Sequence, residues 1–600
     1  MARPAGAGTT VRRATSSVRS SSRLAVLAAA MLAMLASPGF AQQPQPQPQL
    51  QPAPARAPRL IVVISIDQFG SALFSRYRDR FTGGLARIAG QGMVFPNAYQ
   101  SHAITETCPG HSTLLTGTHP NRTGITGNSW FEPGSAKETY CLASTVNRLA
   151  HDARAEGRGP ERLITTTVGD WIKAAGGAGR VVAVAGKDRS ALTMGGHRAD
   201  AVFWYDDKYA GFTTFVAPGE DAQAKLAPVA PVNAALRAQA KPRWDYADDA
   251  CRALEGSYAV GQATWHAKVP PDGWSMDDPA AAARSFRPSP FLDLATLDAA
   301  RAMIDRYALG ADDATDLLTV GLSATDAIGH VYGAGGPEMC DHLGRLDRAL
   351  GDFLDRVFDV APDALVVVTA DHGGSDMPER LRETGYPDAR RLESPAFLRA
   401  LNDSVAAELG LGFAPFVVTE RGYNIDQLYF ASPAGGAFTP ALQARAVAAA
   451  LTWLRARPEV VAAHARTELL ADPRPANPWP EGLTLRQRMA ESAYPGRSGD
   501  IVVAYQPLAS IIPPTPGFYL GGHGTPWDYD RRVPIIFLSR AIPAQERPFA
   551  VETVDIAPTI AAIIHLPAPA GLDGRCLPVP GLTDCADGDA AAPNRSTTSQ

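Results

Sequence analysis

Residues 59–66 read RLIVVISI, and the segment Asp67-Gln68-Phe69-Gly70 follows directly. An unbroken apolar run rich in β-branched residues is typical of a strand that is buried on both faces of a parallel sheet. Asp67 then stands at the carboxyl end of that strand, where open α/β sheets place their ligands. Runs of the same kind recur at 181–185, 316–322, 364–370, 500–505 and 533–538.

Helical patterns lie between and after these runs. Amphipathic segments occupy 292–309, 343–358, 394–409, 440–455 and 554–565. Alternation of buried strands with helices predicts an α/β fold with a largely parallel central sheet flanked by helices. We expect one large domain over residues 59–590, with cap insertions near 190–290 and 375–500, and a flexible tail at 591–600.

The N-terminal region predicts export. An apolar run at 24–36 follows Arg12, Arg13, Arg19 and Arg23, and a small-residue segment comes after it, so residues 1–41 are interpreted as a signal peptide cleaved after Ala41. The run is too short for a comfortable membrane span, which argues against stable membrane insertion. Residues 42–58 are rich in Gln and Pro and predict an extended linker. The expected location is periplasmic or secreted, by the Sec or the twin-arginine route.

The charge balance and the cysteines narrow the function classes further. A formal net charge of −5 means that the chain lacks the excess of basic residues that a stable nucleic-acid partner requires. Six cysteines in an exported chain allow fifteen disulfide connectivities, and their scattered positions do not have metal-site spacing. The short separation of Cys576 and Cys585 favours a bond between these two. Three roles remain for Cys108: a spectator, a disulfide partner or an oxidation-sensitive thiol. The sequence does not decide the oligomeric state, and it is compatible with a monomer.

A second stretch, residues 101–130, carries a candidate nucleophile. Thr107 opens the turn Cys108-Pro109-Gly110, which leads into a short predicted helix at 111–116. The free N–H groups and the positive dipole end of such a helix suit a phosphate, or an alkoxide beside a metal ion. Threonine at a helix start is ordinarily a cap, so the stretch gains meaning only from other residues.

Those other residues are Asp and His side chains placed where strands end. Imidazole nitrogens and carboxylate oxygens are ligands for zinc, and six of them suffice for two sites. Two ions about 3.5–4 Å apart can clamp the attacking and leaving oxygens of a phosphoryl displacement, and one of them would activate the Thr107 hydroxyl. The candidate ligands are Asp67, Asp326, His330, Asp371, His372 and His523.

Two cations follow the predicted strand at 181–185. Lys187 and Arg189 lie two positions apart on one loop and can both point at one anion, Arg as a fork and Lys as a point charge. The alternative is a solvated basic turn.

Taken together, these motifs resemble the alkaline phosphatase superfamily and, more narrowly, the PafA-like bacterial alkaline phosphatases that use a threonine. The resemblance extends over about residues 58–575 and rests on Asp67, Thr107-Cys-Pro-Gly-His, Asp326-xxx-His330, Asp371-His372-Gly-Gly and Gly-His523-Gly. It implies two Zn²⁺ per chain. One zinc would be held by Asp326, His330 and His523, and the other by Asp67, Asp371, His372 and Thr107.

The resemblance also implies residue roles in the reaction. Thr107 would be the nucleophile and form a phosphothreonine, Asn128 would donate to a phosphate oxygen, and Lys187 and Arg189 would neutralise the non-bridging oxygens. Because a monoester dianion has more charge on those oxygens than a diester, the cation pair favours a small-molecule phosphate monoester as substrate. A phosphodiesterase or nucleotide pyrophosphatase is the nearest alternative. A sulfatase is disfavoured because no Arg follows Cys108 in register, and a binding protein without turnover is the remaining alternative from another class.

Overall fold

The computed structural model describes residues 56–132, 137–238, 241–416, 425–430, 438–472, 479–513, 519–583 and 585. The predicted signal peptide at 1–41, nearly all of the predicted linker at 42–58 and the predicted tail at 591–600 lie outside these residues. Among the residues described, no helix combines the length and the apolar character needed to cross a membrane.

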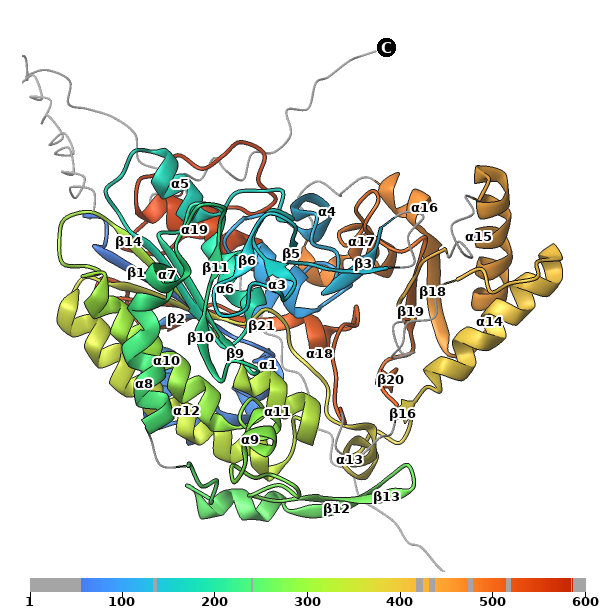
Figure 1. Ribbon diagram of the computed structural model, residues 1–600, viewed down its shortest axis with the longest axis horizontal. Coiled ribbons are helices and arrows are strands. Elements are labelled where there is room, and N and C mark those ends of the chain that lie inside the picture. The colour runs from blue at the N-terminus through green and yellow to red at the C-terminus, as the bar shows by residue number, and fades with distance from the viewer. Residues whose placement is uncertain are drawn as a thin grey trace, which may run out of the picture. The chain divides into compact units, whose positions relative to one another are not determined.

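A mixed sheet of ten strands lies at the centre of the described fold (Figure 1). Its strands, in spatial order, are β10 (Gly211–Thr213), β9 (Ala201–Asp206), β8 (Val181–Ala185), β14 (Asp316–Leu322), β1 (Leu60–Ile66), β15 (Leu365–Thr369), β21 (Arg532–Leu538), β2 (Met93–Tyr99) and β22 (Gln545–Glu546), with β23 (Val551–Glu552) also paired to β2. The five strands from β9 to β15 run parallel, and β21 is antiparallel to both β15 and β2. The predicted α/β class is confirmed, and the parallel part of the sheet is its centre.

The register of the central strands fixes where the functional side chains meet. Ser65 of β1 pairs with Gly321 of β14 on one side and with Thr369 of β15 on the other. The three strands therefore end at nearly the same height. Every residue of β1, β14 and β15 is buried, as expected for strands covered on both faces.

Helices cover both faces of this sheet. On one face lie α10 (Pro290–Arg306) and α12 (Pro337–Val360), with α2 (Gly84–Gln91) against α12; on the other lie α5 (Val168–Ala174) and α19 (Ile556–Ile563) (Figure 1). Two further helices, α3 (Thr107–Leu114) and α6 (Asp188–Gly195), pack against each other beside β8 and β14. The pair α3 and α6 supplies the candidate nucleophile and the candidate phosphate-binding cations.

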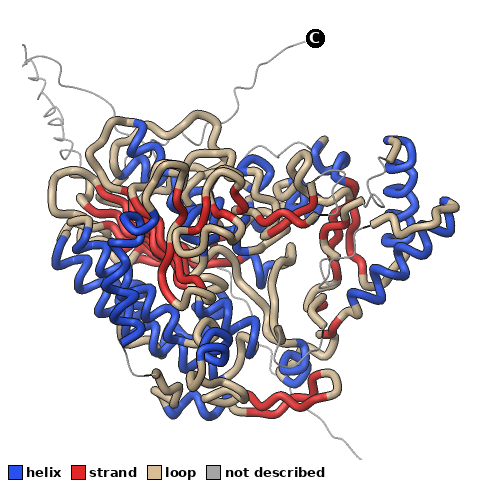
Figure 2. Tube along the Cα trace, viewed as in Figure 1, coloured by secondary structure: helices blue, strands red, loops and turns tan. Residues whose placement is uncertain are grey.

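The predicted strand at 500–505 does not join the central sheet. It is β19 (Ile501–Tyr505), the middle strand of a separate sheet between β17 (Gln427–Leu428) and β18 (Val460–Ala465). Helices α14 (Ser394–Leu409) and α15 (Pro440–Arg455) pack beside it around their own apolar core (Figure 2). The range predicted as the first insertion includes β9 and β10, which are strands of the central sheet, and also the hairpin β12 (Gly256–Val260) and β13 (Ala263–Ala267).

All six cysteines are paired, as Cys108–Cys141, Cys251–Cys340 and Cys576–Cys585. The favoured bond between Cys576 and Cys585 is confirmed. Cys108 is a disulfide partner, which settles its three alternatives.

Candidate active site

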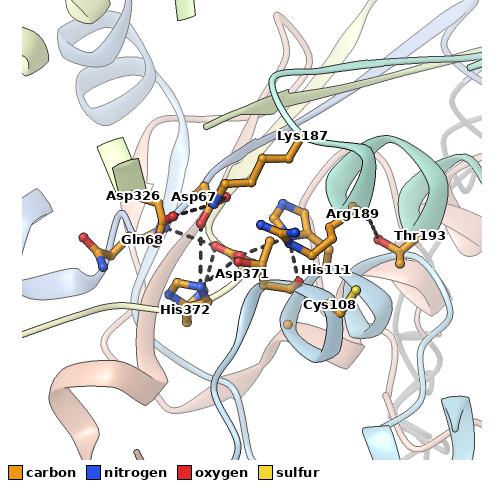
Figure 3. A network of polar contacts seen from close by, with 12 residues as sticks. Asp67, Gln68, Cys108, His111, Lys187, Arg189, Thr193, Asp326, Asp371 and His372 are labelled. Carbon is orange, nitrogen blue, oxygen red and sulfur yellow. Dashed lines mark hydrogen bonds and ion pairs between the residues drawn. The ribbon is translucent and has the colours of Figure 1, made fainter. Parts of the chain in front are cut away.

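Three carboxylates meet at the carboxyl ends of the central strands (Figure 3). Asp67 follows β1 directly, Asp371 follows β15 by two positions, and Asp326 lies in the first turn of α11 (Ala324–Tyr332), which begins just after β14. All three side chains are buried. The Lys187 ammonium lies between two of them, 2.7 Å from Asp67 Oδ2 and in contact with Asp326 Oδ2.

One candidate metal group consists of Asp67, Asp371 and His372, whose ligand atoms all lie within 4.8 Å of one another. His372 Nε2 is 3.2 Å from Asp371 Oδ2 and 3.6 Å from Asp67 Oδ1. The backbone N–H of Gln68 donates to Asp371 Oδ1, and Gln68 has a φ of 66°. A left-handed glutamine is uncommon and costs about 1 kcal/mol or more, so the surrounding structure must hold this turn in place.

The second candidate group surrounds Asp326. His330 Nε2 and His523 Nε2 lie 3.3 and 3.2 Å from Asp326 Oδ1, and 3.0 Å from each other. His372 stacks on His523 with ring centroids 3.7 Å apart, and its ligand atoms also lie within 4.8 Å of those of Asp326 and His523. The structure thus brings all six predicted ligands together in two adjoining groups.

The backbone sets the orientation of the three imidazoles. The Nδ1 atoms of His330, His372 and His523 lie 3.1, 2.8 and 2.8 Å from the carbonyl oxygens of Gly521, Gly373 and Thr105. A ring that donates Nδ1–H to a carbonyl presents its Nε2 to a metal, which is the arrangement typical of metal-binding histidines. All three Nε2 atoms face the carboxylates.

The charges of this cluster favour bound cations. Burial, and the nearby charges of Asp326 and Asp371, raise the pKa of Asp67 well above its usual range. Burial alone lowers the pKa of His523, but its contact with Asp326 raises it to about 9, so the buried carboxylate attracts positive charge to this position. Asp67 Oδ1 and His372 Nε2 are buried without a hydrogen-bond partner. Buried acceptors of this kind are costly unless a cation contacts them, so the residues present fit divalent metal ions with nitrogen and oxygen ligands.

Thr107 lies in the first turn of α3, next to this cluster. The helix begins at Thr107 itself, four residues earlier than predicted, and Thr107 is 2% exposed. His111 joins the two parts of the site, because its Nδ1 lies 3.0 Å from both the Thr107 carbonyl oxygen and Asp371 Oδ2. The hydroxyl-bearing residue, the helix N-terminus and a candidate metal group are therefore adjacent.

Asn128 is held beside Thr107 by two backbone contacts. The Cys108 N–H donates to Asn128 Oδ1 at 2.9 Å, and the Cys141 N–H donates to the Asn128 carbonyl at 3.0 Å. The disulfide Cys108–Cys141 joins the two donors. Because Oδ1 accepts the Cys108 N–H, the Nδ2 amide remains as the donor that Asn128 can offer to a ligand.

The predicted cation pair separates in this structure. Lys187 contacts the carboxylates, whereas Arg189 Nη1 donates to the Tyr140 hydroxyl at 2.8 Å. Both side chains nevertheless line the same cavity of about 1380 Å³, together with Thr107, Asn128 and His523. Aromatic side chains also line this cavity, among them Trp265, Trp274, Tyr519 and Tyr529.

The contact of α3 with the Asp371 turn gives a first prediction. A Cβ on Gly110 would lie 2.2 Å from the Asp371 carbonyl oxygen, and backbone there cannot yield cheaply. We expect Gly110→Ala to displace Thr107, one turn earlier, and to lower kcat/KM by about 100-fold, the typical cost of a misplacement of ~1 Å. The matched control is Gly90→Ala in α2, where a Cβ meets nothing within 4 Å. Steady-state kinetics on both variants measure the effect. If Gly110→Ala were as active as Gly90→Ala, this result would contradict the role of the close contact between α3 and the Asp371 turn.

Several residues of the site were not predicted from the sequence. Glu106, which precedes Thr107 and lines the cavity, could have been noticed as the residue before a helix start. His111 could have been noticed from its position one helical turn after Thr107. Tyr140 and Asp188 have no local signal, because their contacts to Arg189 and Arg158 depend on how distant segments pack.

Comparisons with known proteins agree with this geometry. The family model for type I phosphodiesterase / nucleotide pyrophosphatase matches residues 61–507. Alkaline phosphatase PhoK of a Sphingomonas species is 41% identical over 87% of this chain and 91% of that protein. Alkaline phosphatase PhoD of Zymomonas mobilis is 37% identical over 86% of this chain and 88% of that protein.

A solved structure shares the fold. The crystal structure of alkaline phosphatase PafA matches 87% of this chain and 98% of its own, with a TM-score of 0.74 and 23% identity. The chain therefore belongs to the type I phosphodiesterase / nucleotide pyrophosphatase family of the alkaline phosphatase superfamily, within its group of PhoK- and PafA-like bacterial alkaline phosphatases.

Proposed function

We propose that this protein is a zinc-dependent alkaline phosphatase that hydrolyses phosphate monoesters with Thr107 as its nucleophile. The observation that carries the proposal is the position of Thr107. It lies at the N-terminus of α3 and lines one cavity with Lys187, Arg189 and the second candidate metal group, and His111 of the same helix contacts Asp371 of the first group. The names of the relatives PhoK and PhoD support the same activity.

The proposed metal content is two Zn²⁺ per chain. Asp67, Asp371 and His372, with the Thr107 hydroxyl, would hold one ion, and Asp326, His330 and His523 would hold the other. When bound, the ions supply Lewis-acid charge that lowers the pKa of coordinated hydroxyls and stabilises the leaving oxygen. His372 lies close enough to both groups to keep them adjacent.

The protein's own residues would perform the remaining work. Thr107 Oγ1 forms the bond to phosphorus while the bond to the leaving oxygen breaks, which gives a phosphothreonine and an alcohol. The Asn128 amide would donate to a non-bridging oxygen, and the positive end of the α3 dipole would favour the charge of the phosphate. Water then attacks the phosphothreonine and returns Thr107 and inorganic phosphate. Each donor aimed at developing charge is worth ~3–4 kcal/mol by the precedent of oxyanion holes.

The nearest competing function is hydrolysis of phosphodiesters, which the description of the matching family model favours. Lys187 and Arg189 distinguish the two functions, because a monoester dianion has a second charge for them to neutralise. We expect the wild type to prefer an aryl phosphate monoester over a bis-aryl diester with the same leaving group. The double variant Lys187→Ala/Arg189→Ala should lose most of that preference, through a fall in monoester kcat/KM of about 10³-fold or more.

Steady-state kinetics of both substrates on metal-loaded protein make this test. Arg457→Ala serves as a matched control, because Arg457 packs over Trp453, which extends from a helix beside the second sheet. A wild type that prefers the diester would overturn the monoesterase proposal in favour of the phosphodiesterase. A metal-loaded wild type that turns over neither substrate would instead support binding without catalysis.

The proposed location is the periplasm or the medium. Three disulfides within the described residues support an oxidising compartment. The predicted signal peptide at 1–41 would supply the export signal, and cleavage after Ala41 can be read from the N-terminal sequence of the mature protein.

A further inference from the structure

The Tyr140 hydroxyl lies between Arg189 and the adjacent carboxylate. Arg189 Nη1 donates to Tyr140 Oη at 2.8 Å, and Tyr140 Oη donates to Asp188 Oδ1, also at 2.8 Å. The direct separation between Arg189 Nη1 and Asp188 Oδ1 is 3.9 Å. A neutral hydroxyl therefore occupies the position in which a carboxylate would form a close ion pair with this guanidinium.

The charge of Asp188 is matched by a different arginine. Arg158 Nε donates to Asp188 Oδ2 at 3.0 Å, and the Arg158 guanidinium lies over the Tyr140 ring, 4.5 Å from its centroid. Arg189 Nε is buried without a hydrogen-bond partner. One nitrogen of the Arg189 guanidinium is thus held by a neutral hydroxyl, and other N–H donors of the group are left for a ligand. Arg189 lines both the main cavity and a smaller one of about 240 Å³.

Tyr140 is itself fixed to the phosphate-binding region. It precedes Cys141, whose N–H donates to the Asn128 carbonyl and whose disulfide ends at Cys108, next to Thr107. Burial raises the pKa of Tyr140 above its usual range, so its hydroxyl stays protonated in the alkaline range where such enzymes work. A protonated hydroxyl can accept from Arg189 and donate to Asp188 at the same time.

We propose that Tyr140 is a positioning residue that determines specificity for monoesters. Its hydroxyl orients the Arg189 guanidinium and keeps Asp188 out of direct contact, so that the positive charge of Arg189 remains available to the second negative charge of a monoester dianion. This inference rests on the proposed function of Arg189. In a close Asp–Arg pair the carboxylate would instead cancel much of that charge.

The test is a double-mutant cycle with two substrates. Tyr140→Phe, Arg189→Ala and the double variant are assayed for kcat/KM on an aryl phosphate monoester and on the bis-aryl diester of the same phenol. We expect Tyr140→Phe to lower monoester kcat/KM by roughly tenfold, the size typical of a lost hydrogen bond to a charged group. Diester kcat/KM should change by less than about twofold, because a diester lacks the second charge. In the Arg189→Ala background, Tyr140→Phe should have no further effect.

The matched control is Tyr246→Phe, which removes a hydroxyl that donates to Glu255 at 2.8 Å, remote in sequence from the site. Thermal unfolding of both Phe variants checks that a loss of activity is not a loss of fold. Equal losses on both substrates, or full additivity with Arg189→Ala, would overturn the role of Tyr140. An Arg189→Ala variant that keeps the wild-type substrate preference would instead overturn the proposed function of Arg189, so the two failures are distinguishable.

Discussion

Replacing Thr107 by valine is expected to lower kcat/KM for phosphate monoesters by about 10⁴-fold or more, the scale seen when a nucleophile is removed from a preorganised site. Valine keeps the branched shape of threonine and so keeps the packing of this buried position at the start of α3. What it removes is the oxygen that would attack phosphorus. Steady-state kinetics on metal-loaded protein measure the loss.

Thr107→Ser is the informative partner of this variant. Serine restores the hydroxyl without the methyl group, so we expect it to recover most of the lost activity. A further control is Thr452→Val, because Thr452 is exposed on α15 and its hydroxyl donates to the Ala448 carbonyl of its own helix. A Thr107→Val variant with more than about a tenth of wild-type activity would contradict a nucleophilic role for Thr107.

Removal of the metal ions is the second change with a large expected effect. Prolonged dialysis against a chelator should abolish monoester hydrolysis, and zinc should restore it. Without metal ions, three buried carboxylates lie together at one edge of the sheet, and the Lys187 ammonium contacts two of them. The chelated protein should therefore also unfold at a lower temperature than the zinc-loaded protein.

Single ligand variants locate this effect. We expect His372→Ala to lower kcat/KM by about a thousandfold or more, since charge stabilisation by a bound ion is worth several kcal/mol. Elemental analysis should show about two zinc ions per wild-type chain and fewer in the variant. His464→Ala is the matched control, because His464 lies on β18 in the second sheet, beside Glu468. A His372→Ala variant that retains both the zinc and the activity would contradict the assigned ligands.

Much of this arrangement could be predicted from the sequence because it depends on strand ends. The runs before Asp67, Asp326 and Asp371 are buried strands whose period and composition are visible locally. Since parallel neighbours end at one edge, the residues that follow them must meet. Asp67, Asp326, Asp371 and His372 were predictable for that reason, and the structure gathers them at that edge.

The rest could not be predicted because it depends on long-range packing. β2 was missed because Pro96 and Asn97 interrupt its apolar pattern, and its pairing with β21 shows a register irregularity around them. The strand at 500–505 looks like the central strands in composition, and only its partners place it in the second sheet. The contact of Lys187 with two carboxylates and of Arg189 with Tyr140 likewise has no signal in the loop that contains both cations.

The most direct test of the account is to trap the phosphoryl group on the protein. Metal-loaded wild type and Thr107→Val are mixed with a phosphate monoester, quenched in acid within the first turnovers, digested and mapped by mass spectrometry. The account predicts a phosphothreonine at position 107 in the wild type, lost when the quench is delayed until substrate is exhausted, and no phosphorylated peptide from Thr107→Val. Phosphate on another residue of the wild type, or a phosphorylated and active Thr107→Val variant, would contradict it.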